Sequence, residues 1–366
     1  MPLKSTAGNH GEVAKGRGSP INPEGRFEIH NREAVDDGWF QPPPEDDDRR
    51  PKTVIAIEHA KSVISRHNSP DVGFAQSINP YRGCSHGCPY CFARPSHAYL
   101  GLSPGLDFET RLSVKVNAAE KLREEISKPA YKCEALTIAV NTDAYQPMER
   151  DQRITRSILE LCHETDHPVS IITKNALIER DLDLLAPMAA RKLVNVTISI
   201  TTLDHSIARH MEPRASAPLR RLQAVKRLSE AGIPVNVNIA PVVPFITDHE
   251  LENIMEAAAQ NGAKSAYYNL VRLPWEVKDI FRAWLEARFP LKAAHVMSRI
   301  HEMREGRDND PNFGTRMTGT GLLAELLRQR YQKALKRFGL NEREMDFDLD
   351  TTIFRPPQRN GQGSLF

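Results

Sequence analysis

The 366-residue sequence contains no uninterrupted apolar run close to the roughly 20 residues that a membrane-spanning helix needs. Its first 20 residues, MPLKSTAGNHGEVAKGRGSP, lack the apolar core that a secretory signal requires. The formal net charge is only +2, so no global excess of charge directs the protein to nucleic acid or to a membrane surface. We therefore expect a cytoplasmic protein without a membrane partner, on which any basic surface is local.

Cysteine is also scarce, and its placement is uneven. Of the five cysteines, Cys84, Cys88 and Cys91 fall within eight positions, whereas Cys133 and Cys162 are isolated. An odd number without an export signal argues against a disulfide framework and favours a metal or cluster site. We expect the two isolated cysteines to be small residues of the core.

Short β-rich runs alternate with helical patterns through the middle of the chain. Apolar strands that alternate with helices of 9–14 residues are typical of parallel βαβ units, and six such units predict an α/β fold built on a partial (β/α)6 barrel. In such folds the chemistry lies at the carboxyl ends of the strands. The expected strands cover residues 74–78, 136–141, 169–173, 194–200, 235–240 and 266–270, and the expected helices cover residues 117–126, 153–163, 182–190, 218–231 and 248–261.

Composition divides the chain into four parts. Residues 1–52 are rich in glycine, proline and charge, and we expect a flexible N-terminal arm in which short apolar stretches pack on the barrel. Residues 53–282 form the expected barrel and residues 283–348 a helical C-terminal extension, with an amphipathic helix from 321 to 338. Residues 349–366 form a polar tail.

The three clustered cysteines form a C-x3-C-x2-C motif, YRGCSHGCPYC (residues 81–91), directly after the first expected strand. Thiolates are soft ligands that suit iron–sulfur clusters or zinc, and closed structural sites need four ligands. Three alternatives follow. The site is a structural zinc with His86 or His97 as fourth ligand, an electron-transfer cluster completed by Cys133 or Cys162, or a catalytic cluster with one iron open to a small molecule.

The C-x3-C-x-aromatic-C pattern after a first strand resembles the signature of the radical S-adenosylmethionine (SAM) superfamily. The resemblance implies a [4Fe–4S] cluster on Cys84, Cys88 and Cys91, SAM on the open iron, and Tyr90 near the adenine. In that superfamily an electron from the cluster cleaves SAM to a 5′-deoxyadenosyl radical. The resemblance therefore favours the third alternative, and it implies reduced flavodoxin or ferredoxin as electron donor.

Four further stretches resemble the branch that includes spore photoproduct lyase, and within it a group of uncharacterised bacterial proteins. The resemblance runs from about residue 77 to residue 273. The stretches are NPYRGC (79–84), NTDAYQP (141–147), ITK (172–174) and MEPRA (211–215).

Polar residues follow the second expected strand. In the superfamily this strand end binds the amine of SAM, and Asn141, Thr142 and Asp143 supply the oxygen acceptors that an ammonium group needs. The alternative is a polar turn, which Asn, Asp and the following Pro147 also favour. We prefer the ligand role because of the strand-end position.

The next two strand ends add a lysine and a serine. Lys174 could hold the SAM carboxylate and Ser199 a ribose hydroxyl, as the resemblance to the lyase implies. Arg214 could clamp the methionine carboxylate with its fork of donors, or form a structural ion pair with Glu212.

One departure from the lyase bears on its chemistry. Spore photoproduct lyase uses a cysteine just before its strand-two Ser-Asp pair as hydrogen donor to the product radical. The matching place here is Val140 or Asn141, and neither has an S–H group. Cys133 is expected near the start of the same strand, at the wrong end of the barrel. The sequence therefore does not predict repair of a spore thymine dimer.

Two features of the C-terminal region suggest partners. The segment 316–337 could track a phosphate backbone, but we favour the alternative that it is the solvated face of an amphipathic helix. The last five residues, Gln362-Gly363-Ser364-Leu365-Phe366, resemble tails that dock on the bacterial sliding clamp. The segment's basic residues are Arg316, Arg328, Arg330, Lys333, Lys336 and Arg337, against a single acid, Glu325.

These observations predict a radical SAM enzyme that abstracts hydrogen from an unknown substrate, with nucleic-acid repair or modification as the leading hypothesis. The alternative is a non-catalytic iron–sulfur or zinc protein that acts as a nucleic-acid or clamp-binding module.

Overall fold

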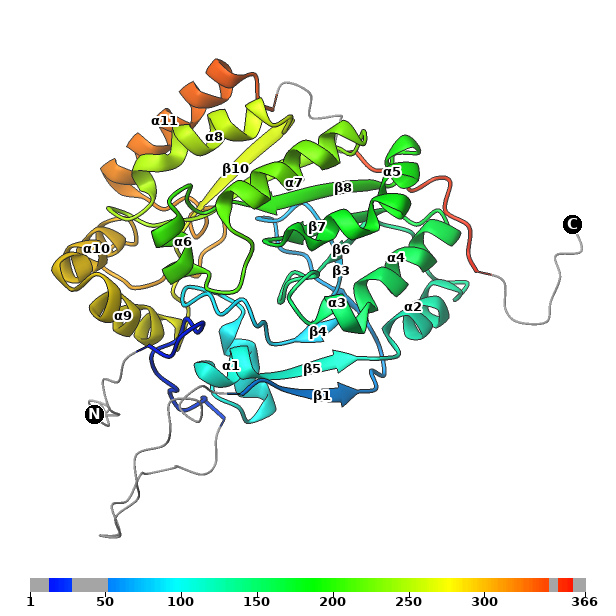
Figure 1. Cartoon of the computed structure of the whole chain (residues 1–366), viewed down its shortest axis with the longest axis horizontal. Coiled ribbons are helices and arrows are strands. Elements are labelled where there is room, and N and C mark those ends of the chain that lie inside the picture. The colour runs from blue at the N-terminus through cyan, green and yellow to red at the C-terminus, as the bar shows by residue number, and fades with distance from the viewer. Residues whose placement is uncertain (1–12, 28–51, 342–347, 358–366) are drawn as a thin grey trace, which may run out of the picture.

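The computed structural model describes residues 13–27, 52–341 and 348–357 (Figure 1). Its centre is a seven-stranded sheet in the order β10-β9-β8-β7-β6-β3-β2. Neighbouring strands pair in parallel from β3 to β10, and only β2 runs antiparallel, against β3. The strands are β2 Ile64–Arg66, β3 Gln76–Ile78, β6 Leu136–Ile138, β7 Val169–Thr173, β8 Val194–Ser199, β9 Val235–Val242 and β10 Ser265–Leu270.

Helices connect the parallel strands, as parallel pairing requires. The six parallel strands and their helices confirm the predicted partial (β/α)6 barrel (Figure 1). The α-helices of the barrel are α1 Leu106–Thr110, α2 Ala118–Ile126, α3 Glu149–Gln152, α4 Ile154–Glu164, α5 Leu182–Ala190, α6 His205–Met211, α7 Pro218–Glu230 and α8 Leu251–Gln260. The 3-10 helices are η1 Arg94–Leu100, η2 Ala176–Asp181 and η3 Asp248–Glu250.

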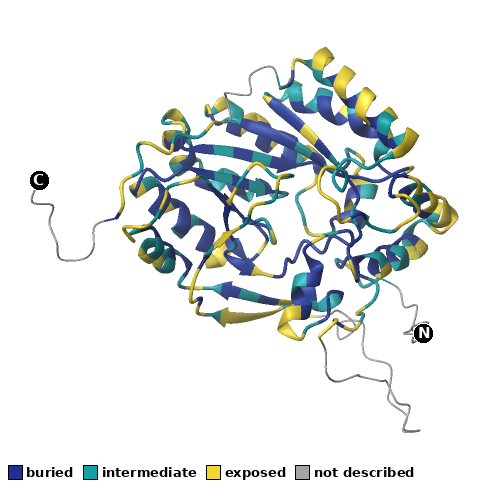
Figure 2. Ribbon diagram, turned by 180° about the vertical axis from the view of Figure 1, so that it is seen from behind, coloured by how far each residue is buried: buried dark blue, intermediate teal, exposed yellow. Residues whose placement is uncertain are grey.

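The main apolar core lies between the sheet and these helices. On β7 the buried residues alternate, with Val169 and Ile171 fully buried, as expected for a strand with two different faces. On α2 the buried residues Ala118, Leu122 and Ile126 recur every four positions. Figure 2 shows the result, with dark blue strands inside and yellow helix faces outside.

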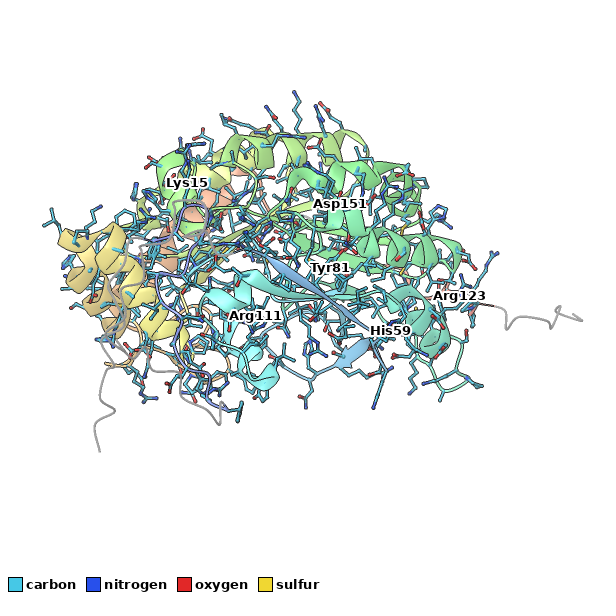
Figure 3. The ribbon with its side chains drawn as sticks, turned by 60° about the horizontal axis from the view of Figure 1, so that its bottom comes forward. Lys15, His59, Tyr81, Arg111, Arg123 and Asp151 are labelled. Carbon is cyan, nitrogen blue, oxygen red and sulfur yellow. The ribbon has the colours of Figure 1, made fainter. Side chains whose placement is uncertain are left out.

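A second, three-stranded sheet was not anticipated from the sequence. Strand β1 (Val54–Glu58) pairs in parallel with β5 (Arg111–Lys115), and β4 (Tyr81–Arg82) pairs antiparallel with β5. Strand β1 is largely exposed, so its side chains carry no burial pattern that would have identified it. Strand β4 brings Tyr81 into the interior immediately before the cysteine motif, whereas Arg123 on α2 lies near the periphery (Figure 3).

Residues 13–27, which we name the N-terminal strap, lie within the segment expected to be flexible. The structure packs them against the barrel: Arg17 is 5% exposed, and the Arg26 guanidinium lies over the Trp275 ring and 2.8 Å from Glu276. The strap therefore forms part of the described domain. Its position next to α1 and α9 is visible in Figure 1.

The C-terminal region is helical, as predicted. Helix α9 (Val277–Arg288) begins before the expected boundary at residue 283, and α10 (Pro290–Glu302) follows it. Helix α11 (Gly321–Phe338) has the predicted bounds, and the Tyr331 hydroxyl donates to the Ala266 carbonyl on β10. None of the helices in the described ranges is long and apolar enough to cross a membrane.

Candidate active site

The cysteines lie on a tight loop that follows β4. Gly83 and Gly87 both have φ of +71°, a backbone conformation that residues with a side chain rarely adopt. The Cys84 N–H donates to the Phe108 carbonyl at 2.9 Å, and the Gly87 N–H donates to the Cys84 carbonyl at 3.3 Å. These bonds fold residues 83–91, which we name the cysteine loop, against the end of α1.

Packing around the cysteine loop leaves no room for larger residues. A Cβ added at Gly87 would lie 2.4 Å from Glu109 Oε2, and one added at Gly18 of the strap would lie 1.6 Å from the Gly87 carbonyl oxygen. The Arg94 guanidinium donates to the Cys88 carbonyl at 2.8 Å and to the Gly87 carbonyl at 3.1 Å. The backbone of the loop is therefore held by an arginine on one side and the strap on another.

The three cysteines of the loop differ in exposure. Cys84 is 8% and Cys88 7% exposed, and Cys91 is half-buried. Burial raises the pKa of Cys84 far above its usual value, and the neighbouring Asp143, Cys88 and Cys91 raise it further. Burial likewise raises the pKa of Cys88 to about 12. Three thiols on one short loop, two of them buried and one half-buried, are soft donors that suit an iron–sulfur cluster.

All three cysteines line one cavity of about 510 Å³, within the size range of small-molecule sites. The cavity lies at the carboxyl ends of the parallel strands, as expected for this fold. Of the residues predicted to hold the cluster or SAM, all except Arg214 line it. The lining comes from the segments 67–74, 84–93, 139–143, 172–174, 238–241, 269–272 and 316–317, and from Ser199.

Asp143 is buried at the edge of the cavity, and its oxygens are already engaged. Oδ1 accepts from the Tyr145 N–H at 2.9 Å and the Thr173 hydroxyl at 2.6 Å, and Oδ2 accepts from the Lys174 N–H at 2.8 Å. Burial alone would raise the pKa of Asp143, but the facing His86 and these donors lower it to about 2. Its clearest structural effect is to join the ends of β6 and β7.

Two predicted neighbours of Asp143 retain free polar groups. Thr142 Oγ1 is buried and has no hydrogen-bond partner among the described residues. Asn141 is exposed, and its backbone N–H donates to the Asn79 side chain at 2.8 Å. Both side chains line the cavity and can act as acceptors there.

Glu212 is the centre of a buried network that sequence reasoning did not resolve. It is ion-paired with Arg221, not with Arg214, and it accepts the hydroxyls of Tyr90 and Thr201. Burial alone would raise the pKa of Glu212, but Arg221 and Lys174 lower it. The network fixes the Tyr90 side chain one residue before Cys91.

Arg214 is exposed and does not line the cavity, so the structure does not bring it to the other predicted residues. Its nearest described neighbourhood is the strap, where a Cβ added at Gly16 would lie 3.8 Å from Arg214 Nε. Lys174 does line the cavity, and no carboxylate of the described residues lies within ion-pair distance of its ammonium group.

The two histidines near the motif have different surroundings. His86 is 1% exposed, its Nδ1 lies 3.4 Å from Asp143 Oδ2, and its Nε2 has no partner among the described residues. His97 instead contacts the Arg111 carbonyl at 2.9 Å and does not line the cavity. Within the described ranges no three His, Cys, Asp or Glu side chains are placed to share one metal ion, whereas a [4Fe–4S] cluster puts each thiolate on a different iron.

The remaining cysteines lie away from the cavity. Cys162 is fully buried on α4, which agrees with a core role, and neither Cys133 nor Cys162 lines the cavity. Val140 and Asn141 do line it. Neither residue has an S–H group, so the end of β6 offers no thiol to the cavity.

The basic C-terminal segment does not form one free cationic stripe. Arg316 is paired with Asp71 at the cavity wall, and Arg330 is 2.6 Å from Glu252 on α8. Arg328 is paired with Glu325 on the same helix. This supports the solvated-face interpretation of α11. The proposed clamp-docking tail, Gln362 to Phe366, lies outside the described residues.

Comparisons with known proteins agree with this site. The model of the radical SAM superfamily matches residues 78–258, which include the cysteine loop and strands β6 to β9. An uncharacterized protein of Mycobacterium tuberculosis is 33% identical over 284 residues, which cover 76% of this chain and 79% of the relative. An uncharacterized protein of Methanocaldococcus jannaschii is 26% identical and covers 65% of this chain and 84% of the relative. This chain therefore belongs to the radical SAM superfamily.

Solved structures identify a similar fold. A mutant form of spore photoproduct lyase superposes with a TM-score of 0.56 at 16% identity, over 86% of each chain. Another mutant form, solved with bound AdoMet and dinucleoside spore photoproduct, gives a TM-score of 0.55 at 17% identity, over 78% of this chain and 79% of the other. At these identities the likeness concerns the fold alone.

Proposed function

We propose that the protein holds a [4Fe–4S] cluster on Cys84, Cys88 and Cys91 and reductively cleaves SAM to abstract hydrogen from a substrate in the same cavity. The observation that carries the proposal is that the three thiols of the cysteine loop and the polar strand-end residues line one cavity of about 510 Å³. When bound, the cluster supplies the electron that converts SAM to a 5′-deoxyadenosyl radical. The protein supplies binding, orientation and exclusion of water.

The free polar groups of the cavity suit the parts of SAM. The Lys174 ammonium has no carboxylate partner among the described residues and can hold the SAM carboxylate. Thr142 and Asn141 offer acceptors for the SAM ammonium, and the buried Ser199 can bond a ribose hydroxyl. Tyr90 is oriented by Glu212 next to the cluster cysteines and can pack against the adenine. Arg214 has no part in this arrangement.

The reaction requires a one-electron reductant, and we propose reduced flavodoxin or ferredoxin in the cytoplasm. Nucleic-acid repair or modification is the proposed role. It is supported by the likeness in fold to a lyase whose structure contains a dinucleoside lesion. Neither Val140 nor Asn141 has an S–H group that could donate hydrogen to a product radical. Docking of the last five residues on a sliding clamp stays a prediction.

The proposal is tested with anaerobically purified protein after reconstitution with iron and sulfide. Dithionite and SAM are added, and 5′-deoxyadenosine is measured for the wild type and for Cys88→Ala. Cys162→Ala is the matched control, because it removes a buried thiol outside the cavity. We expect the wild type and Cys162→Ala to form 5′-deoxyadenosine and Cys88→Ala to form none.

The opposite result is equally informative. If the wild type carries a full cluster but forms no 5′-deoxyadenosine with or without nucleic acid, the enzymatic proposal is wrong. The alternative of a cluster-containing binding module then remains. In that case Lys174→Ala leaves both the iron content and the affinity for any partner unchanged.

A further inference from the structure

A part of the cavity wall outside the cysteine loop joins distant parts of the chain. Arg316 donates through Nη2 to the Ser69 hydroxyl at 2.7 Å and pairs through Nε with Asp71. The Gly314 N–H also donates to Asp71, at 2.8 Å. The Leu270 N–H donates to the Met317 carbonyl at 2.9 Å. These bonds connect the β2–β3 loop, the end of β10 and the loop before α11 into one wall.

The Arg272 guanidinium, which belongs to this wall, has few hydrogen-bond acceptors among the described residues. It lines the cavity, its Nε is buried without a partner among the described residues, and its Nη1 contacts only the Met317 sulfur, at 3.6 Å. No described carboxylate lies within ion-pair distance. Burial and the nearby Arg316 lower the pKa of Arg272, whereas Asp71 and Asp310, both beyond ion-pair distance, act in the opposite direction. A half-buried guanidinium with a weak sulfur acceptor is incomplete, because each N–H needs an acceptor.

Two cations of the cavity lining, Lys174 and Arg272, have no ion-pair partner among the described residues, whereas Arg316 is paired with Asp71. The one carboxylate of the lining, Asp143, already accepts from three donors and faces His86. SAM brings one carboxylate, which the proposed function assigns to Lys174. The cation Arg272 is then left for the second molecule in the cavity.

Other residues of the cavity lining are suited to a planar ring. Phe74 and Phe92 line the cavity as flat apolar surfaces. Asn238 and Asn269 line it too, with their amide groups 3.5 Å apart in a bond too long to occupy them fully. Aromatic faces, carboxamide edges and a guanidinium fork together match a base, its hydrogen-bonding edge and a phosphate.

We propose that Arg272, supported by Arg316, binds a phosphate group of a nucleotide or nucleic-acid substrate on the wall formed by the β2–β3 loop, the end of β10 and the loop before α11. The inference rests on the proposed function and adds the substrate class and the residue that selects it. The phosphate binds through the fork of Arg272, and Arg316 both adds charge and anchors the wall through Asp71. The base lies between this wall and the SAM site, within reach of hydrogen abstraction.

The test measures binding to the cluster-loaded protein with SAM present, by isothermal titration calorimetry. The probes are thymidine, thymidine 5′-monophosphate and the dinucleotide thymidylyl-(3′→5′)-thymidine, because pyrimidines do not compete for the adenine site. We expect Arg272→Gln to weaken the phosphate-bearing probes roughly tenfold to a hundredfold and to leave thymidine unaffected. If Arg272→Gln loses affinity only for the dinucleotide, the bound group is a phosphodiester within a strand. If it loses affinity only for the monophosphate, the bound group is a terminal phosphate.

Two controls make the result specific. Arg328→Gln removes an exposed arginine of α11 and should leave all three affinities unchanged. Arg272→Lys keeps the positive charge but loses the guanidinium fork, so it should bind the phosphate probes with an affinity between those of the wild type and Arg272→Gln. This variant also provides a test if Arg272→Gln is unstable. The inference is overturned if the wild type binds thymidine and both phosphate probes with equal affinity. It is also overturned if Arg272→Gln or Arg272→Lys loses affinity for all three probes to the same extent.

The same wild-type preparation is assayed for 5′-deoxyadenosine, which separates the two proposals. If the protein forms 5′-deoxyadenosine but binds the probes equally with and without phosphate, only the Arg272 inference is wrong. Phosphate-dependent binding without any 5′-deoxyadenosine from a full cluster means that the enzymatic function is wrong and that Arg272 belongs to a nucleotide-binding module.

Discussion

Arg94 and Glu109 form an ion pair with 3.0 Å between Nη2 and Oε1, and neither side chain is exposed to solvent. The Arg94 guanidinium also holds the carbonyls of Gly87 and Cys88, while Glu109 accepts the Gly18 N–H of the strap at 3.0 Å. One buried pair thus joins the cysteine loop, helix α1 and the N-terminal strap. The position of the proposed cluster ligands depends on it.

Glu109→Gln should therefore destabilise the fold by about 3 kcal/mol or more, because it leaves the buried Arg94 charge uncompensated. The free energy of unfolding is measured anaerobically in urea. Glu164→Gln breaks the exposed pair with Arg123 and should cost no more than about 1 kcal/mol. Similar losses in both variants would contradict the central role of the Arg94–Glu109 pair.

Gly18→Ala tests whether the strap holds the cysteine loop. The added methyl would overlap the Gly87 carbonyl, and backbone cannot move as cheaply as a side chain, so we expect the strap to detach. The expected result is faster loss of cluster absorbance in air and faster proteolysis of the strap. Gly73→Ala is the control, because nothing lies within 4 Å of its added Cβ. An air-stable cluster in Gly18→Ala would show that the strap does not shield the site.

Local patterns in the sequence predict much of the barrel. The bounds of β7, α5 and α11 agree with the predicted ranges, because alternating and 3.6-residue periodicities record which face of each element is buried. The cysteine motif and the strand-end residues up to Ser199 were also identified from spacing and resemblance. The structure adds that they line one cavity.

Other parts of the site depend on contacts between residues far apart in the chain. Gly18 meets Gly87, and Glu212 accepts the hydroxyl of Tyr90, which is 122 positions away. Glu212 also pairs with Arg221 although Arg214 is nearer in sequence. No local composition distinguishes these partners from other charged or small residues. Arg272 likewise follows a strand without any motif, and only the assembled wall shows that it lacks an acid.

His167 should make stability depend on pH. Its Nδ1 lies 3.0 Å from the Pro168 carbonyl and its Nε2 lies 2.7 Å from the Tyr131 hydroxyl, an arrangement that suits the neutral ring. Burial lowers the pKa of His167 to about 4. Between about pH 6.5 and pH 4 the unfolded chain then binds a proton that the folded chain does not, so stability falls as the pH falls.

The loss of folding stability that His167 causes should reach about 3 kcal/mol near pH 4 and be absent above pH 7. Urea unfolding across this range is compared for the wild type, His167→Gln and the exposed His205→Gln. We expect His167→Gln to lose this part of the pH dependence and His205→Gln to keep it. If the free energy of unfolding of His167→Gln falls with pH as steeply as that of the wild type, groups other than His167 cause the pH dependence.

Lys174→Met should weaken SAM binding without loss of iron. The ammonium group lines the cavity without a carboxylate partner among the described residues, so its removal costs little packing but leaves the SAM carboxylate without a cation. Charged hydrogen bonds of this kind correspond to roughly a tenfold or greater loss of affinity. SAM affinity is measured by calorimetry, and iron and sulfide are counted per chain. Lys226→Met, on the exposed face of α7, should change neither quantity, whereas equal SAM affinity in Lys174→Met and the wild type would leave Lys174 as an ordinary loop residue.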